Sequence, residues 1–79
     1  MPAPDTVTAE DIAGLFRRIL ETPEVEPDSD FFDLGGDSLL ATRVLSAVAR
    51  EFGLELTITD FMDAASPGAL AKLIRSTAA

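Results

Sequence analysis

The residues of this chain that could do chemistry lie in one short segment, Asp30–Leu40. Its centre is Ser38, which follows Asp37 and the glycine pair Gly35 and Gly36. We expect a helix to begin at Asp37 or Ser38. This would expose the Ser38 hydroxyl at a helix N-terminus, where the backbone favours an anionic group such as a phosphate. The glycines lack side chains and would let the backbone of another protein approach the serine closely.

The composition limits what Ser38 can do. The 79 residues include no His and no Cys, so the usual general bases, thiol nucleophiles and soft metal ligands are missing. Residues 36–39 match the Gly-Asp-Ser-Leu signature of a lipase and esterase family and part of a Gly-x-Ser-x-Gly nucleophile elbow. That interpretation fails because a nucleophilic serine needs a base, and a small helical domain has no sheet to present the elbow. Ser38 is then either a simple helix-cap residue or the acceptor of a group that another enzyme attaches.

The net charge of −8, from 14 acidic and 6 basic residues, restricts the partners that this chain can meet. Binding to nucleic acid or to an anionic membrane requires basic side chains that neutralise phosphate, so we expect neither partner. The charge favours encounters with basic patches on other proteins. The N-terminus has no basic region followed by an apolar run, and no stretch approaches the roughly 20 apolar residues of a membrane span. We therefore expect a cytoplasmic protein.

The acidic residues Asp28, Asp30 and Asp33 invite comparison with a calcium-binding loop. Their spacing does not fit an EF-hand, because Phe32 occupies the fifth position and Leu39 stands where the bidentate glutamate belongs. We interpret these residues as part of a solvated acidic loop and expect no metal site.

The hydrophobic periodicity predicts an all-α fold, a bundle of four helices with a short third helix and a long first loop, in one domain over residues 1–79. The expected helices span approximately residues 9–20, 38–52, 59–64 and 67–76. Apolar residues at helical spacing mark the first of them: Ile12, Leu15, Phe16, Ile19 and Leu20. Gly53 is the expected end of the second helix, and Ser66 with Pro67 is the expected start of the last.

The segments around these helices also carry predictions. Thr8 and Asp11 resemble a capping box at the start of the first helix, and Pro23 is expected to close it. Residues Met1–Thr6 are expected to be frayed, and Leu54–Ile58 is expected to be an extended loop because it has no second strand to pair with. Residues 21–37 form the long first loop, which contains seven carboxylates. Its apolar residues are expected to pack back on the core: Val25, Phe31, Phe32 and Leu34.

Residues Phe31–Leu39, Phe-Phe-Asp-Leu-Gly-Gly-Asp-Ser-Leu, resemble the motif of the peptidyl carrier proteins, or thiolation domains, of nonribosomal peptide synthetases, within the wider acyl carrier protein-like family. The likeness continues through Phe52–Leu56 and Ala69–Ala71 and covers roughly residues 9–74. It implies that Ser38 carries a covalent 4′-phosphopantetheine arm derived from coenzyme A. It also implies that the arm holds an aminoacyl or peptidyl group as a thioester, supplying the thiol that this chain lacks. The carrier itself would catalyse nothing.

The same resemblance implies partner enzymes: a phosphopantetheinyl transferase, an adenylation enzyme, and condensation, tailoring or thioesterase enzymes. Asp37 would cap the helix and shape the site, while Gly35 and Gly36 would allow close approach. Many peptidyl carriers have His before the serine, whereas Asp is usual in carriers of fatty-acid and polyketide biosynthesis. An acyl carrier protein of those pathways is therefore an alternative. A non-catalytic protein-interaction module without a prosthetic group is the alternative from another class.

Four residues are candidates for contact with partner enzymes: Leu39, Thr42, Arg43 and Met62. Leu39 is apolar on an otherwise polar helix face beside Ser38, although a single exposed leucine is also normal. Thr42 and Arg43 lie on the same side, where a solvated face is an equal alternative. Methionine adapts to several partners, which favours Met62 as the fourth contact, and we assign its neighbour Phe61 to the core. The core of a small domain is large enough to bury the predicted apolar faces of the helices, so we expect a monomer.

Overall fold

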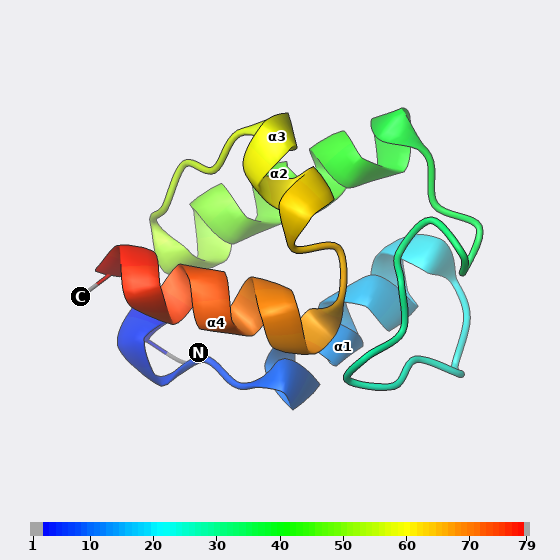
Figure 1. Cartoon of the computed structure of the whole chain (residues 1–79), viewed down its shortest axis with the longest axis horizontal. Helices are drawn as coiled ribbons and strands as arrows, with labels where there is room; N and C mark the ends of the chain where they lie inside the picture. Colours follow the sequence, from blue (N-terminus) through cyan, green and yellow to red (C-terminus); the bar gives the residue numbers. More distant parts are fainter. Residues whose placement is uncertain (1–2, 79) are drawn as a thin grey trace.

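The computed structural model describes residues 3–78, among which there is no strand. Its elements are a short 3-10 turn, η1 (Pro4–Thr6), and four α-helices, α1 (Ala9–Leu20), α2 (Ser38–Phe52), α3 (Ile58–Asp63) and α4 (Pro67–Ala78). Helix α4 packs against α1 and η1, and α2 packs against α1 and α3. Turn η1 lies beside α4 (Figure 1). The predicted all-α fold with four helices and a short third helix is confirmed. Within residues 3–78, none of the helices is both long and apolar enough to cross a membrane.

Local capping signals set the ends of α1. Thr8 and Asp11 form the predicted capping box: the Asp11 N–H donates to the Thr8 hydroxyl oxygen at 3.2 Å, and the Thr8 N–H donates to the Asp11 carboxylate at 2.8 Å. The C-terminal end differs from the prediction. The helix ends because Glu21 adopts the left-handed conformation, with a φ of 54°, and donates its N–H to the carbonyl of Arg17. Pro23 therefore lies beyond a helix that has already ended.

The other helices also begin and end at capping residues. Gly53 has a φ of 71° and ends α2, as predicted. Helix α3 starts one residue earlier than expected, because Thr57 and Asp60 form a second capping box. Helix α4 starts at Pro67, as predicted, and extends two residues beyond the expected end, to Ala78.

The core is built around three phenylalanine rings that have no exposed surface, Phe16 of α1, Phe31 of the first loop and Phe61 of α3. Phe31 stands edge-on to both of the others, with centroid separations of 5.0 Å to Phe16 and 5.1 Å to Phe61. Edge-to-face pairs contribute stability beyond the area that they bury. The assignment of Phe61 to the core is confirmed, and the loop supplies the ring that joins α1 to α3.

The expectation of a frayed N-terminal segment is wrong for the part that the structure describes; Met1 and Pro2 lie outside the described residues. Residues Pro4–Thr6 form the η1 turn, and Val7 after it is buried. Arg75 of α4 donates from Nη1 to the Val7 carbonyl at 2.7 Å. This long-range bond and the burial of Val7 fix the segment, and neither leaves a signal in the local sequence.

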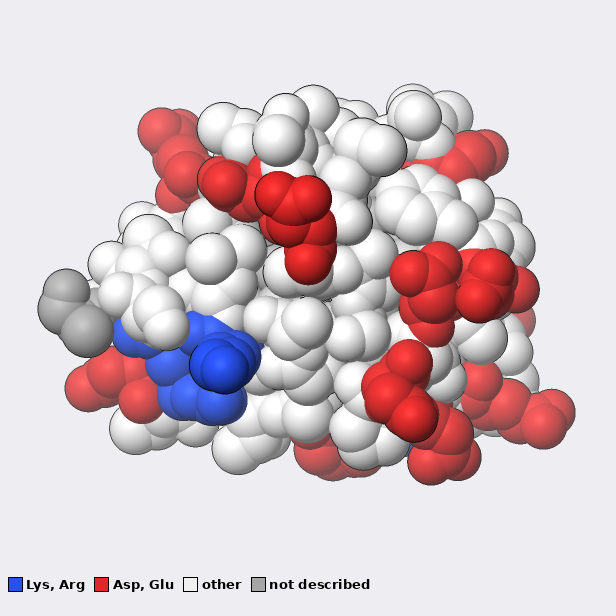
Figure 2. Space-filling model, in the orientation of Figure 1, with Lys and Arg blue, Asp and Glu red and all other residues white. Residues whose placement is uncertain are grey.

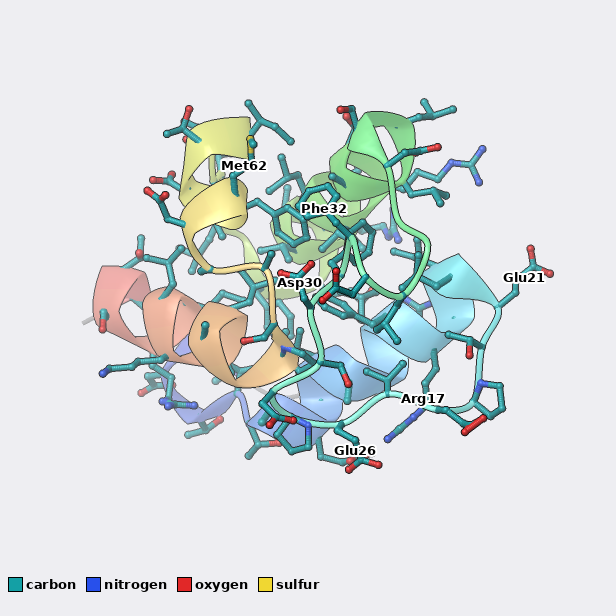
Figure 3. All side chains as sticks on the ribbon, turned by 45° about the vertical axis from the view of Figure 1, so that its right-hand side comes forward. Arg17, Glu21, Glu26, Asp30, Phe32 and Met62 are labelled. Carbon is teal, nitrogen blue, oxygen red and sulfur yellow. The ribbon has the colours of Figure 1, made fainter. Side chains whose placement is uncertain are left out.

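The first loop, residues 21–37, is fastened to the helices at several points. Arg17 of α1 donates from Nη2 to the Val25 carbonyl at 3.1 Å, and Figure 3 shows Arg17 beside the loop. The Phe31 N–H donates to the carbonyl of Ala65, just before α4, at 2.8 Å. Both Val25 and Phe31 are buried, as predicted. The loop is therefore part of the folded core despite its length and its acidic composition.

The start of α4 holds the middle of the loop. The Gly68 N–H donates to the Pro27 carbonyl at 2.8 Å, and a side chain at position 68 would meet that carbonyl oxygen at 3.1 Å. Leu34 is half-buried against the core, as predicted. Phe32 packs against Phe31, with ring centroids 5.6 Å apart, but remains 36% exposed. One phenylalanine of the pair thus belongs to the core and the other to the surface.

Candidate functional site

Ser38 is the first residue of α2, and it is exposed. Asp37 precedes it in an extended conformation and caps the helix, because its Oδ1 accepts a hydrogen bond from the Leu40 N–H at 2.9 Å. The backbone carbonyl of Ser38 accepts from the Thr42 hydroxyl at 2.9 Å. The Ser38 hydroxyl takes part in none of the side-chain hydrogen bonds within residues 3–78. The interpretation of Ser38 as a simple helix cap is therefore wrong: Asp37 caps the helix, and the serine hydroxyl is available.

The surroundings of this hydroxyl fit a covalently attached phosphate. The N–H groups of the first turn and the helix dipole stabilise negative charge at this end of α2. The first turn itself contains no Asp or Glu, so the carboxylate at this helix end is that of the Asp37 cap. The chain has no His to act as a base beside Ser38. The arrangement therefore suits a serine that is modified rather than one that attacks a substrate.

The two glycines before Asp37 have different physical roles. Gly35 has a φ of 99°, which side-chain-bearing residues rarely adopt, and a Cβ there would face open space. At Gly36 a Cβ would lie 2.3 Å from Cε2 of Phe31, so only glycine fits against that buried ring. The Gly36 N–H also donates to the Phe31 carbonyl at 3.0 Å. Sequence reasoning missed this internal requirement, because the contact depends on how the loop folds around Phe31.

Three of the four predicted partner contacts lie together. Leu39, Thr42 and Arg43 line one open groove of about 320 Å³ between α2 and the C-terminal half of α1. Leu39 is 66% exposed, so its apolar side chain is not part of the core. The groove also contains residues that sequence reasoning did not single out as contacts: Arg18 and Ile19 of α1, and Ser46, Ala47 and Arg50 of α2.

Met62 is the predicted contact that the structure separates from this groove. It lies on α3 and is 63% exposed. Figure 3 shows Met62 and Phe32 on the same part of the surface, one on α3 and one on the first loop. The Phe32 ring centroid is 6.1 Å from that of Phe61, which is the neighbour of Met62 in α3. Phe32 was expected to pack on the core; it does contact Phe31 and Phe61, but it remains an exposed apolar residue near α3.

Asp30 of the acidic first loop has a structural role. The Asp30 carboxylate accepts hydrogen bonds from the N–H groups of Phe32 at 2.9 Å and Asp33 at 3.1 Å, which caps the turn that leads to the glycines. Within the part of the chain that the structure describes, no three His, Cys, Asp or Glu side chains are placed to hold a metal ion. Asp30 therefore helps to position the start of α2 through the backbone.

Residues 10–74 match the family described as "Phosphopantetheine attachment site". The chain belongs to this family. A probable nonribosomal peptide synthetase of Salinispora arenicola, CymA, is 41% identical over 69 residues, which are 87% of this chain and 1% of that protein. A dimodular nonribosomal peptide synthase of Bacillus subtilis is 36% identical over an alignment of 83 positions, which covers 91% of this chain and 4% of that protein. The chain thus spans a few per cent of the length of the curated relatives that it matches.

Solved structures in this family share the fold. The complex of the phosphopantetheine transferase Sfp with coenzyme A and a peptidyl carrier protein contains a chain with a TM-score of 0.84 and 26% identity. The similarity covers 96% of this chain and 99% of that one. The resemblance to the peptidyl carrier proteins of nonribosomal peptide synthetases is confirmed, and so is the predicted family of domains with a phosphopantetheine attachment site.

Proposed function

We propose that Ser38 is the attachment point of 4′-phosphopantetheine and that the chain forms one carrier domain for aminoacyl or peptidyl groups. The observation that carries this proposal is the exposed Ser38 hydroxyl, free of internal hydrogen bonds, at the first residue of α2. Asp37 supports it by taking over the capping role, through its hydrogen bond from the Leu40 N–H. When attached, the arm supplies a thiol that holds the carried group as a thioester.

The residues of the chain present the serine to other enzymes. Asp37 fixes the first turn of α2, and Gly36 lets the loop pass against the Phe31 ring immediately before that turn. Gly35 has no neighbour within 4 Å of its Cβ direction, which leaves room for another backbone to approach. These features orient Ser38 on a surface that a modifying enzyme can reach.

The proposed partners are a phosphopantetheinyl transferase, an adenylation enzyme, and condensation, tailoring or thioesterase enzymes. Leu39 and Met62 are exposed apolar side chains that lie next to the modified turn and on α3 respectively. Contiguous exposed apolar surface marks sites of protein contact, and Met62 lies on the same part of the surface as the exposed Phe32 ring (Figure 3). Thr42 and Arg43 extend the candidate contact surface along α2.

The test is intact-mass spectrometry after incubation with coenzyme A and a broad-specificity phosphopantetheinyl transferase. Wild type is expected to gain the mass of one phosphopantetheine, and Ser38→Ala is expected to gain none. Ser76→Ala is the matched control, because Ser76 is exposed and lies on α4, and it is expected to be modified like wild type. An unmodified wild type, or a modified Ser38→Ala, would contradict the assignment. Loading by an adenylation enzyme, compared with loading by an acyltransferase, then tests the aminoacyl or peptidyl cargo.

A further inference from the structure

Five of the six basic side chains of this acidic protein gather in two places. Figure 2 shows one of them, a patch beside the C-terminal part of α4, where Lys72 and Arg75 are exposed. The second is the groove between α1 and α2, which is lined by Arg18, Arg43 and Arg50. Half of the six Lys and Arg residues of a chain with a net charge of −8 therefore line one groove.

The charge of the groove is not neutralised from within. Glu51 is the carboxylate paired with these arginines, at 2.8 Å from Arg18 and 3.9 Å from Arg50. No carboxylate within residues 3–78 lies within 4.0 Å of the Arg43 guanidinium. The three arginines and Glu51 together carry a net charge of +2. The groove therefore favours contact with a negatively charged partner.

The spacing of the α2 residues in the groove indicates the shape of its occupant. They stand at positions i, i+3, i+4, i+7, i+8 and i+11: Leu39, Thr42, Arg43, Ser46, Ala47 and Arg50. This is the spacing of a helix seam that packs against another helix. At a rise of 1.5 Å per residue the seam is roughly 16 Å long, which matches about three turns of a partner helix.

The floor of the groove is apolar and its rim is basic. Leu39 is 66% exposed, and Ile19 and Ala47 lie along the same groove. Helices that dock in such grooves present apolar anchors at i, i+3 or i+4, and i+7. A volume of about 320 Å³ in an open groove accommodates the side chains of such a helix, whose backbone would remain outside.

We propose that the α1–α2 groove docks an acidic amphipathic helix of a partner protein, with apolar side chains on Leu39 and Ile19 and a carboxylate on Arg43. The proposal rests on the carrier function proposed above, because it names the chemistry of a partner. The guanidinium of Arg43 offers a fork of N–H donors that matches a carboxylate. Salt at physiological ionic strength screens charges that are more than about 8 Å apart, so the distant carboxylates of the protein oppose such a partner only weakly and the groove arginines act at contact.

The experiment is a titration followed by amide NMR shifts at physiological salt. The probe is a synthetic helical peptide of about 15 residues, with Leu at helical spacing and Glu on the flanking positions. A counterpart carries Lys in place of every Glu. We expect the Glu peptide to shift the amides of Leu39, Thr42 and Ser46, and the Lys peptide to bind at least several-fold more weakly.

Two charge-reversed variants of the protein make the test specific. Arg43→Glu is expected to lower the affinity for the Glu peptide by roughly five- to tenfold, because the variant loses an exposed ion pair and gains a repulsion. Lys72→Glu is the matched control, with the same change in net charge at an exposed position on α4, and its affinity should stay within about twofold. Arg43→Gln, which removes the charge without reversing it, should give a smaller loss than Arg43→Glu.

Several results would overturn the proposal. They are equal binding of the Lys peptide, equal effects of Arg43→Glu and Lys72→Glu, and peptide-induced shifts centred on Met62 instead of the groove. Groove shifts that depend on protein concentration without peptide would show a second copy as the occupant and would also overturn it. The titration uses unmodified protein, so its failure leaves the Ser38 mass gain standing, and an unmodified Ser38 leaves the peptide result standing.

Discussion

Replacement of Gly36 by alanine gives a direct test of how the loop supports the start of α2. The added Cβ would lie 2.3 Å from Cε2 and 2.7 Å from the carbonyl oxygen of Phe31. Carbon atoms in favourable contact are about 3.5–4.0 Å apart, so the contact with the ring is roughly 1.2–1.7 Å too short. The ring has no free space to move into, because Phe31 is fully buried between Phe16 and Phe61. The loop backbone must shift instead.

The expected cost follows from overpacking of a buried site. Such substitutions cost about 1–3 kcal/mol, and we expect roughly 2–3 kcal/mol because Gly36→Ala meets both a ring and a backbone oxygen. A change of 1 kcal/mol moves Tm by about 4–8 °C in a domain of this size, so Tm should fall by roughly 10–20 °C. This is a large part of a total stability that scales as about 0.05–0.15 kcal/mol per residue.

The assay is urea and thermal unfolding followed by circular dichroism at the helical band, with Gly14→Ala as the matched control. Gly14 lies inside α1, and a Cβ there would meet nothing within 4 Å. The same added methyl group should therefore stabilise the protein by about 0.5–1 kcal/mol at position 14, because alanine favours a helix interior over glycine. The two substitutions are thus expected to have opposite signs.

The double variant Gly36→Ala/Phe31→Leu separates the ring contact from a general effect of alanine. Because leucine removes the ring edge, Gly36→Ala should cost about 1 kcal/mol less in the Phe31→Leu background than in wild type. A Gly36→Ala variant within about 0.5 kcal/mol of wild type, or strict additivity with Phe31→Leu, would refute the reasoning.

Three further predictions concern the helix caps and the surface. Asp37→Ala should cost about 1 kcal/mol because α2 loses its N-cap, whereas Asp37→Asn keeps an acceptor and most of the stability; urea unfolding measures both, and equal losses would contradict the cap. Backbone and side-chain hydrogen bonds with Thr57 lower the pKa of Asp60 below its ordinary value of 3.8. The stabilisation from this carboxylate is therefore complete above pH 3.8 and is lost as the pH falls through the lowered pKa. An NMR titration should show the Asp60 midpoint below 3.8 in wild type and closer to that value in Thr57→Ala; an unchanged midpoint in the variant would argue against the capping box. Phe61→Ala should cost about 3–5 kcal/mol, whereas Met62→Ala, at a side chain that is 63% exposed, should cost less than about 0.5 kcal/mol. Thermal unfolding compares the two, and similar losses would contradict the division of α3 into a core face and a surface face.

The features that could be predicted from the sequence are those encoded by neighbouring residues. The capping box of Thr8 and Asp11 and the glycine stop at Gly53 each depend on a few positions, and the structure has both. The exposed position of Ser38 could be predicted in the same way, because the residue types of Asp37 and Ser38 indicate the start of a helix. Capping signals of this kind can be read without the tertiary fold, although the left-handed Glu21 that ends α1 was not predicted.

The features that could not be predicted depend on residues far apart in the chain. The bond from Arg75 to the Val7 carbonyl joins positions 68 residues apart and orders a segment that looked frayed. The α1–α2 groove combines Arg18 with Arg43, and neither helix alone shows that their cations share a groove. The fit of Gly36 against the Phe31 ring likewise follows from the folded loop, because composition predicts only that glycine is flexible.

The anchoring of the first loop has a consequence for how the proposed carrier would present Ser38 to its partner enzymes. Arg17 of α1, and Ala65 and Gly68 around the start of α4, hold this loop at three points, which fixes the path of the chain toward Ser38. If the proposed carrier function is correct, each partner enzyme meets the serine in this same orientation. Movement of the carried group between catalytic centres would then come from the length of the proposed arm and from displacement of the whole domain.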